Sequence, residues 1–274
     1  MNDKPSHQDP SVSSWWKTDI IEMEPGVIKF RGHAIEDLIG QVSFPQMIWL
    51  MTRGNLPTDS EAALLEAALV AAVDHGPQAP SIAIARMAAT CGVGLNSAMA
   101  SGLNVLGDVH GGAGEQAVEL YYEIKSRLEK GEELNIATQQ VIDGFISEKG
   151  KYLPGFGHRF HPVDPRAPRL LSLVKQAAEQ KAVTGVFATI AEAIEENLER
   201  RKGKKIPMNI DGATAVIYAE LGFEPPLARG IFCLSRSVGL LAHAWEQTQQ
   251  GGRNKGPIPR DYLWSYTGPQ KPPA

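Results

Sequence analysis

The chain has 274 residues, of which 43% are hydrophobic and 21% are charged, and its net charge is −4. These fractions are ordinary for a globular protein and exclude a mostly disordered chain, while the mild acidity argues against nucleic acid as the main partner. Two cysteines make no disulfide framework, and no stretch approaches the ~18 uninterrupted apolar residues of a membrane span. The N-terminus lacks an apolar signal core, so we expect a cytoplasmic location and no membrane partner.

The first third of the chain predicts one hairpin and then helices. We expect residues 1–18 to form a flexible segment and residues 19–33 to form a short hairpin around a Pro-Gly pair. Thr58 and Glu61 have the spacing of a capping box, which predicts the start of a helix. Residues 79–106 are rich in Ala, Ser and Gly, a composition that permits close packing between helices.

The rest of the chain is dominated by helical periodicity, and no convincing strand pattern occurs. Residues 150–166 contain too many glycines and prolines for a regular element and are predicted to be a loop. The sequence therefore predicts a mainly α fold, with a smaller domain inserted over about 167–205 and a Gly/Pro-rich tail from residue 250. The further predicted helices cover residues 113–130, 135–148, 167–181, 184–201, 211–222 and 226–249.

Histidines in glycine-rich segments are the first candidates for chemistry, because neighbouring glycines let a ligand approach closely. His75 and His110 are of this kind, although each could equally be a hydrogen-bonded loop histidine. His158, His161 and Asp164 have a spacing that could bind a metal on a helix, but the prolines around them argue against a helix. The motif HExxH is absent, so we expect no metal site and keep a metal hydrolase as a minor alternative.

One carboxylate and a group of arginines also stand out. Asp211 lies at the start of a predicted helix, where it could be an N-cap, a catalytic carboxylate, or both. Arg236 lies in an otherwise apolar helix, so its guanidinium needs an internal Asp or Glu or a bound anion. A small polycarboxylate could supply that anion, and Arg166 and Arg260 are grouped with Arg236 for this reason.

Several segments, in this order along the chain, resemble the citrate synthase superfamily. The resemblance spans roughly residues 19–267, and the trio of HGG, GFGHR…DPR and NIDG is specific in combination. The segment DHGP and the run IDGA…LSRSVG are most similar to citryl-CoA lyases and to the C-terminal lyase module of ATP-citrate lyase. The matching strings are VDHGP (73–77), GDVHGGAGE (107–115), PGFGHRFHPVDPR (154–166), MNIDGATAVIYAELG (208–222) and GIFCLSRSVGLLAHAWEQ (230–247).

The resemblance implies a mainly α, citrate-synthase-like architecture. We expect a large helical domain of residues 19–160 and 206–274 and a small helical domain of residues 161–205. The chain is expected to lack the longer N-terminal helical region of full citrate synthases. It also has His110 where the animal ATP-citrate lyase module has Phe in Phe-Gly-Gly, and this residue does not separate a lyase from a synthase.

The resemblance also assigns roles to particular residues. The implied catalytic trio acts on the thioester oxygen, the oxaloacetate carbonyl and the α-carbon, and it consists of His110, His158 and Asp211. The implied carboxylate-binding residues are His75, Arg166, Arg236 and, from a partner subunit, the tail residue Arg260, with Arg253 as its alternative. The implied contacts to coenzyme A are Gly155, Gly157, Arg159, Lys204 and Lys205.

The activity implied is cleavage of citryl-CoA to acetyl-CoA and oxaloacetate. No permanently bound cofactor is expected, because coenzyme A enters as the substrate thioester. The alternatives are a short citrate or 2-methylcitrate synthase and, from another class, a non-catalytic CoA-binding paralogue. The acyl group is left open, because Phe160 and His161 lie in a loop that varies among related enzymes. The expected partners are a second copy in a homodimer or higher oligomer and a separate citryl-CoA synthetase.

Overall fold

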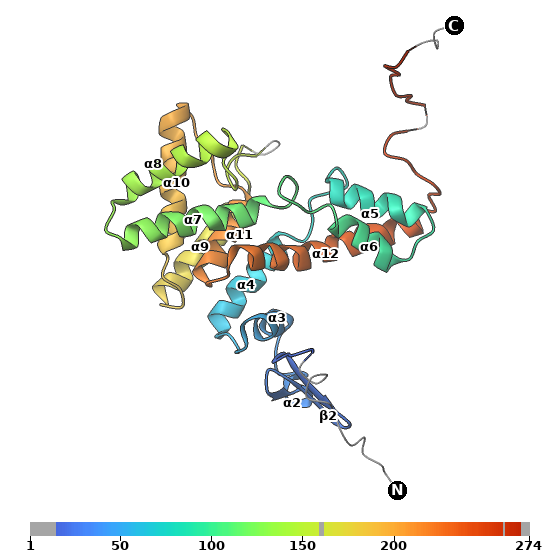
Figure 1. The fold of residues 1–274 in the computed structure, drawn as a ribbon, viewed down its shortest axis with the longest axis horizontal. Coiled ribbons are helices and arrows are strands. Elements are labelled where there is room, and N and C mark those ends of the chain that lie inside the picture. The colour runs from blue at the N-terminus through green and yellow to red at the C-terminus, as the bar shows by residue number, and fades with distance from the viewer. Residues whose placement is uncertain (1–14, 159–161, 260, 270–274) are drawn as a thin grey trace.

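The structure, a computed structural model, describes residues 15–158, 162–259 and 261–269 and is mainly α-helical (Figure 1). The predicted fold class is confirmed. The helices are α2 (Ile35–Leu38), α3 (Phe44–Arg53), α4 (Asp59–Ala71), α5 (Pro80–Thr90), α6 (Leu95–Leu103), α7 (Ala113–Glu129), α8 (Leu134–Lys149), α9 (Arg166–Glu179), α10 (Val186–Lys202), α11 (Ile210–Glu220) and α12 (Pro225–Gln249).

A small antiparallel sheet precedes the helices. Glu24 pairs with Val27, so a two-residue Pro-Gly turn joins the first two strands and the predicted hairpin is confirmed. A third strand of only two residues extends this sheet, and a segment that short has no periodicity by which the sequence could predict it. The strands are β1 (Ile21–Glu24), β2 (Val27–Phe30) and β3 (His33–Ala34), in the order β1-β2-β3.

The start of α4 shows how local chemistry fixes a helix boundary. The Glu61 amide donates to Thr58 Oγ1 over 3.3 Å, and the Thr58 amide donates to the Glu61 carboxylate over 2.8 Å. Two amides that have no partner inside the helix are thereby satisfied. The predicted capping box is confirmed, and α4 ends at Ala71 as the sequence run predicted within a few residues.

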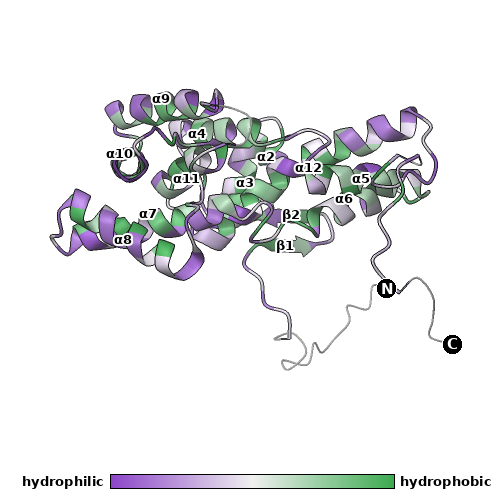
Figure 2. Ribbon diagram, turned by 90° about the horizontal axis from the view of Figure 1, so that it is seen from above, coloured by the Kyte–Doolittle hydropathy of each residue, from purple (hydrophilic) through white to green (hydrophobic). Residues whose placement is uncertain are grey.

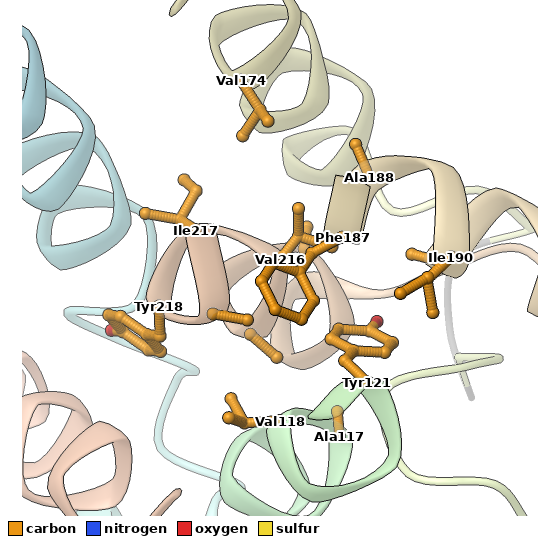
Figure 3. Packing of buried hydrophobic residues seen from close by; sticks show 14 of the residues in the cluster. Ala117, Val118, Tyr121, Val174, Phe187, Ala188, Ile190, Val216, Ile217 and Tyr218 are labelled. Carbon is orange, nitrogen blue, oxygen red and sulfur yellow. The ribbon is translucent and has the colours of Figure 1, made fainter. Parts of the chain in front are cut away.

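The main hydrophobic core is built around α11 (Figure 3). Nearly every side chain of this helix is buried, so its apolar surface extends around the whole circumference rather than along one stripe. Helices α7, α9 and α10 pack against it, and the buried Tyr121 of α7 donates a hydrogen bond to the Gly212 carbonyl over 3.2 Å. The core therefore fixes where the N-terminus of α11 lies.

A second, smaller cluster joins α5 and α6 to the C-terminal half of α12. Ile82, Ala85 and Leu240 are fully buried there. The long helix α12 runs from the main core to this cluster and contacts both (Figure 1). The predicted small domain of residues 161–205 stays a prediction, and the packing groups the helices differently, because α9 and α10 share the main core with α7, α8 and α11.

The outward faces of the peripheral helices are polar, whereas green apolar segments gather where helices meet (Figure 2). Helix α9 shows this amphipathic arrangement, with Leu170 and Val174 buried and the opposite face exposed. Within the described ranges, every helix is too short or too polar to cross a membrane.

Candidate active site

One cavity of about 860 Å³ brings together residues from six separate parts of the chain. Its wall is formed by the α4–α5 connection, the loop before α7, the segment around residue 158, the start of α9, the start of α11 and the middle of α12. Of the residues predicted to bind or transform the substrate, those that line the cavity are His75, His110, Gly157, His158, Arg166, Asp211 and Arg236.

Asp211 is held at the cavity by the first turn of α11. The prediction that it could be the N-cap is wrong, because Asn209 Oδ1 accepts from the Asp211 amide over 3.0 Å and from the Gly212 amide over 3.3 Å. The Asp211 carboxyl is therefore not used for capping and faces the cavity. Burial raises its pKa above the usual value, against the opposing effect of the Arg236 and Arg166 charges.

His110 is fixed by the N-terminus of α5. The backbone amide of Ser81 donates to His110 Nε2 over 3.2 Å, and Ser81 Oγ lies 3.0 Å from the same nitrogen. Because an amide can only donate, Nε2 accepts and the neutral ring carries its proton on Nδ1. Burial lowers the pKa of His110, and the positive charges of Arg236 and His75 lower it further. The ring is thus a neutral hydrogen-bond donor.

His75 and His158 form a pair on the cavity wall. Their ring centroids lie 6.0 Å apart with planes inclined at 65°. Burial lowers the pKa of His75, and the neighbouring Arg236 and Arg166 act in the same direction. An anion bound between these groups would reverse part of that effect, because a negative charge stabilises a protonated ring.

Arg236 is the most buried charge of the cavity, with 6% of its surface exposed. Its Nε donates to the Ala72 carbonyl over 3.3 Å, and its guanidinium lies 4.8 Å from the centre of the Phe232 ring. Among the described residues it forms no ion pair with an Asp or Glu, so the alternative of an internal salt bridge is wrong there. Burial lowers the pKa of Arg236. A buried cation without a carboxylate partner favours the binding of an anionic ligand.

Arg166 at the start of α9 has an internal partner. Its Nε donates to Asp164 Oδ1 and its Nη2 donates to Asp164 Oδ2, each over 2.9 Å. Asp164 is only 1% exposed. The same carboxylate accepts from the Ile210 amide over 3.1 Å. Asp164 therefore links Arg166 to the start of α11 and so fixes the distance between two walls of the cavity.

The hydrogen bonds of Asp164 argue against the alternative of a metal site at residues 158–164. Both of its oxygens are already occupied by Arg166 and the Ile210 amide, which leaves no lone pair directed toward a shared metal. His161 lies outside the described residues. In the parts of the chain that the structure describes, no group of three His, Cys, Asp or Glu side chains is arranged to hold a metal ion.

The residues predicted to contact coenzyme A do not all reach the cavity. Gly157 lines it, whereas Gly155 lies beneath the wall against Gly212, where a Cβ atom would come within 2.7 Å of the Gly212 Cα. That close approach, together with φ of +84°, requires glycine at 155. Lys204 and Lys205 are exposed in the connection between α10 and α11. Arg159 and the tail residue Arg260 lie outside the described residues.

Four residues of the site were missed by sequence reasoning. Ser81 could not be found, because its contact joins residues 29 positions apart in the chain. The N-x-D spacing of Asn209 and Asp211 did carry a signal, since an Asn two residues before a helical Asp is a common cap. The other two, Asp74 and Phe232, lie inside the matching strings VDHGP and GIFCLSRSVGLLAHAWEQ, but only the folded structure shows that they line the cavity.

Comparisons with known proteins agree with this geometry. Residues 58–260 match the family model "Citrate synthase, C-terminal domain". A citrate synthase of Saccharolobus solfataricus is 29% identical over 213 residues, which are 77% of this chain and 54% of that protein. The chain thus spans about half the length of the curated relatives it matches.

Two solved structures extend the comparison. Citryl-CoA lyase from Hydrogenobacter thermophilus has 34% identity and a TM-score of 0.80, covering 94% of this chain and 98% of its own. Citrate synthase from Thermoplasma acidophilum, in a ternary complex with carboxymethyl coenzyme A and oxaloacetate, has 25% identity and a TM-score of 0.66, covering 84% of this chain and 59% of its own. The predicted resemblance is confirmed, and the chain belongs to the citrate synthase family.

Proposed function

We propose that the protein is a citryl-CoA lyase, which cleaves citryl-CoA to acetyl-CoA and oxaloacetate. The observation that carries this proposal is the single cavity that holds two buried or half-buried arginines, three histidines and one raised-pKa carboxyl. The whole-length similarity to a citryl-CoA lyase supports the lyase direction. The reaction class, enolate chemistry on an acyl-CoA, is common to lyases and synthases of the family.

The proposed cleavage uses acid and base groups of this chain. His158 removes the proton of the tertiary hydroxyl, the carbon–carbon bond breaks, and the hydroxyl carbon becomes the carbonyl of oxaloacetate. The electron pair of the broken bond moves into the enolate of acetyl-CoA, whose oxygen accepts a hydrogen bond from His110 Nδ1. Asp211, as a carboxylic acid, then gives its proton to the terminal carbon of the enolate. The raised pKa of Asp211 favours that acid form at the start of each cycle.

The remaining cationic groups hold the substrate in place. Arg236 has no carboxylate partner among the described residues and is suited to bind one substrate carboxylate, with His75 beside it. Arg166 also lines the cavity, and Asp164 binds the edge of its guanidinium that carries Nε and Nη2. When the carboxylates of the substrate are held in place, the breaking bond stays aligned with His158 and Asp211. This alignment is the main way in which positioning is expected to accelerate the reaction.

Coenzyme A enters as part of the substrate, so the proposed reaction needs no resident cofactor and no metal. Gly157, Arg159, Lys204 and Lys205 are the proposed CoA contacts, and Gly155 supports the loop that carries the first two. We further place the protein in the cytoplasm as a homodimer in which Arg260 of one subunit completes the other site. A separate citryl-CoA synthetase would supply the substrate.

The second candidate function is a short citrate or 2-methylcitrate synthase. The similarity to a citrate synthase of Saccharolobus solfataricus favours it, and the acid–base groups would be the same. The two activities differ in one step, because a synthase hydrolyses the citryl-CoA thioester and a lyase protects it.

Free thiol measured after mixing the protein with acetyl-CoA and oxaloacetate separates the two. The lyase proposal predicts that little CoA thiol appears within the time in which citryl-CoA itself is cleaved. Prompt stoichiometric release of thiol together with citrate would establish a synthase instead. If the protein catalyses neither reaction and Asp211→Ala behaves as the wild type in exchange of acetyl-CoA α-protons, it is a non-catalytic paralogue.

A further inference from the structure

Helix α12 lies directly against the turn that carries His75. Arg236 Nε donates to the Ala72 carbonyl over 3.3 Å. One helical turn further along, Gly239 approaches the Val73 carbonyl so closely that a Cβ atom would lie 2.2 Å from its oxygen. The next turn places His243 on the same face, since residues four apart on a helix point in the same direction. The turn at 72–76 therefore rests on a continuous face of α12.

Asp74 joins that turn to His243. Its Oδ2 accepts from the Gly76 amide over 3.1 Å, which closes a local turn around His75. Its Oδ1 is buried, has no well-aligned hydrogen bond among the described residues, and lies 3.2 Å from His243 Nε2. Burial alone would raise the pKa of Asp74, but the Gly76 amide and His243 together keep it below the usual value. The carboxylate is thus charged, and His243 is the partner of its buried oxygen.

The orientation of His243 is fixed from its other side. Arg86 Nη1 lies 3.0 Å from His243 Nδ1, and an arginine can only donate, so Nδ1 accepts and the ring proton is on Nε2, the nitrogen that lies 3.2 Å from Asp74 Oδ1. Arg86 is itself bound to the Glu246 carboxylate over 2.5 Å and to Gln250 Oε1 over 2.8 Å. These contacts hold the guanidinium in place, so the imidazole cannot turn without losing both of its neighbours.

We infer that His243 is a positioning residue for His75, acting through Asp74 on the turn at 73–76. His243 does not line the cavity, whereas Asp74, His75 and Gly76 do. A charged carboxylate held at a fixed place fixes the backbone of the turn and with it the direction of the His75 ring. The inference rests on the proposed function in one point only, which is that His75 binds a carboxylate of the substrate.

Three variants on α12 test the role of His243. His243→Phe keeps an aromatic ring at this place but removes both ring nitrogens, including the Nε2 that lies beside Asp74 Oδ1. His243→Gln keeps an amide N–H near the position of Nε2 and can restore the contact. The matched control is Thr248→Ala, because Thr248 lies on the same helix and its hydroxyl bonds only to chain neighbours: it donates to the Trp245 carbonyl over 2.6 Å and accepts from Gln249 Nε2 over 3.4 Å. Thermal unfolding of all three reports whether the helix is intact.

The first readout is the ¹⁵N spectrum of the histidine rings in the ligand-free protein, assigned with single His→Gln variants. We expect the His75 resonances to move in His243→Phe, to return toward the wild-type position in His243→Gln, and to stay unchanged in Thr248→Ala. The His110 resonances stay unchanged in all three, because His110 is held by Ser81. Unmoved His75 resonances in a folded His243→Phe protein overturn the inference, whatever reaction the protein catalyses.

The second readout is the kinetics of citryl-CoA cleavage. Loss of one oriented contact to a charged group predicts a KM raised about tenfold with a smaller change in kcat, and recovery in His243→Gln. In the His75→Ala background, His243→Phe should add little, because it acts through the same ring. Full additivity of the two substitutions would contradict the inference. A wild-type protein that cleaves no citryl-CoA would refute the proposed function, and the spectra would still decide the positioning role.

Discussion

Asp211 and His110 show how burial, as the largest cause, can prepare an acid and a hydrogen-bond donor for the same reaction. Burial raises the pKa of the Asp211 carboxyl and lowers that of the His110 imidazole. Both changes favour the uncharged form of a group that faces the cavity. Enolate chemistry at neutral pH needs this pair of states, since one group gives a proton and the other donates to the developing oxyanion.

Asp211→Asn tests the acid at this position. The amide has nearly the same volume but cannot give a proton to the enolate carbon, so kcat for cleavage should fall about 10²–10⁴-fold. Oxaloacetate should still bind within a few-fold of wild-type affinity by calorimetry, because the arginines and His75 are untouched. Retained exchange of acetyl-CoA α-protons in solvent deuterium would rule out Asp211 as the proton donor.

Arg236→Met tests the electrostatic link between the arginine and the acid. The Arg236 charge lowers the pKa of Asp211, so its removal should raise that pKa further. Cleavage requires protonated Asp211, and activity is lost as pH rises through its pKa. The alkaline limb of kcat against pH, measured at saturating citryl-CoA, should therefore move to higher pH, and KM should rise.

The matched control for that profile is Arg127→Met, because Arg127 lies at the surface with Gln140 and Glu132 as partners. Its pH profile should coincide with that of the wild type. An alkaline limb that stays in place or moves to lower pH in Arg236→Met would mean that a group other than Asp211 titrates there.

The same residues show how far sequence reasoning reaches. His110, His158, Asp211 and Arg236 were predictable because they lie in segments whose combination is specific, and the structure places all four at one cavity. The capping role of Asp211 was wrongly predicted, because Asn209 competes for the same amides and only the folded turn shows which side chain bonds them. Contacts between distant segments, such as that of Ser81 with His110, leave no local pattern.

At the scale of elements, α12 is the part of the fold that aligns the cavity walls. It carries Arg236 into the cavity, supports the His75 turn through Gly239, and binds the loop before α7 through Arg229, whose Nη2 lies 2.6 Å from Asp108. Helical periodicity predicted this element to within one residue at its start. From the sequence, Gly239 is only a residue of low helix propensity within a predicted helix. The need for glycine there comes from the backbone of Val73, which the sequence does not place beside it.

Gly239→Ala tests the contact between α12 and the turn. A Cβ atom at this position would lie 2.2 Å from the Val73 oxygen, so either the turn or the helix must shift. We expect a loss of about 1–3 kcal/mol in the free energy of unfolding, measured with urea, and a raised KM for citryl-CoA.

Gly230→Ala on the same helix is the matched control, because a Cβ atom there would meet nothing within 4 Å. Alanine has the higher helix propensity, so this variant should gain about 0.5–1 kcal/mol with unchanged kinetics. Equal effects of the two substitutions would show that the turn does not depend on close packing against α12.

At the scale of the whole molecule, the cavity lies where segments from both hydrophobic clusters meet. Helix α5, which belongs to the smaller cluster, fixes His110, whereas α11 in the main core carries Asp211. The sequence predicted the helices but not this grouping, because periodicity shows which face of a helix is buried and not what covers it. Movement of one cluster relative to the other would change the distance between these two groups.

The proposed homodimer predicts a partner for the exposed side of α12. Leu234, Val238, Leu241 and Trp245 are 47%, 57%, 42% and 55% exposed and follow one another at helical spacing. Val238→Glu should therefore shift the mass measured by light scattering from twice 29.7 kDa toward a single chain. A wild-type protein that is monomeric at micromolar concentration would contradict the proposed dimer, while an unchanged dimer in Val238→Glu would exclude this stripe as its interface.

The proposed lyase cleaves the carbon–carbon bond of citryl-CoA and leaves the thioester intact. The most direct measurement is a product analysis after incubation with citryl-CoA, in which acetyl-CoA, oxaloacetate, citrate and free CoA are separated and quantified over time. We expect equal amounts of acetyl-CoA and oxaloacetate, with free CoA and citrate no higher than in a sample without protein. Citrate and free CoA as the main products would contradict it and assign the chain a synthase-type thioester hydrolysis.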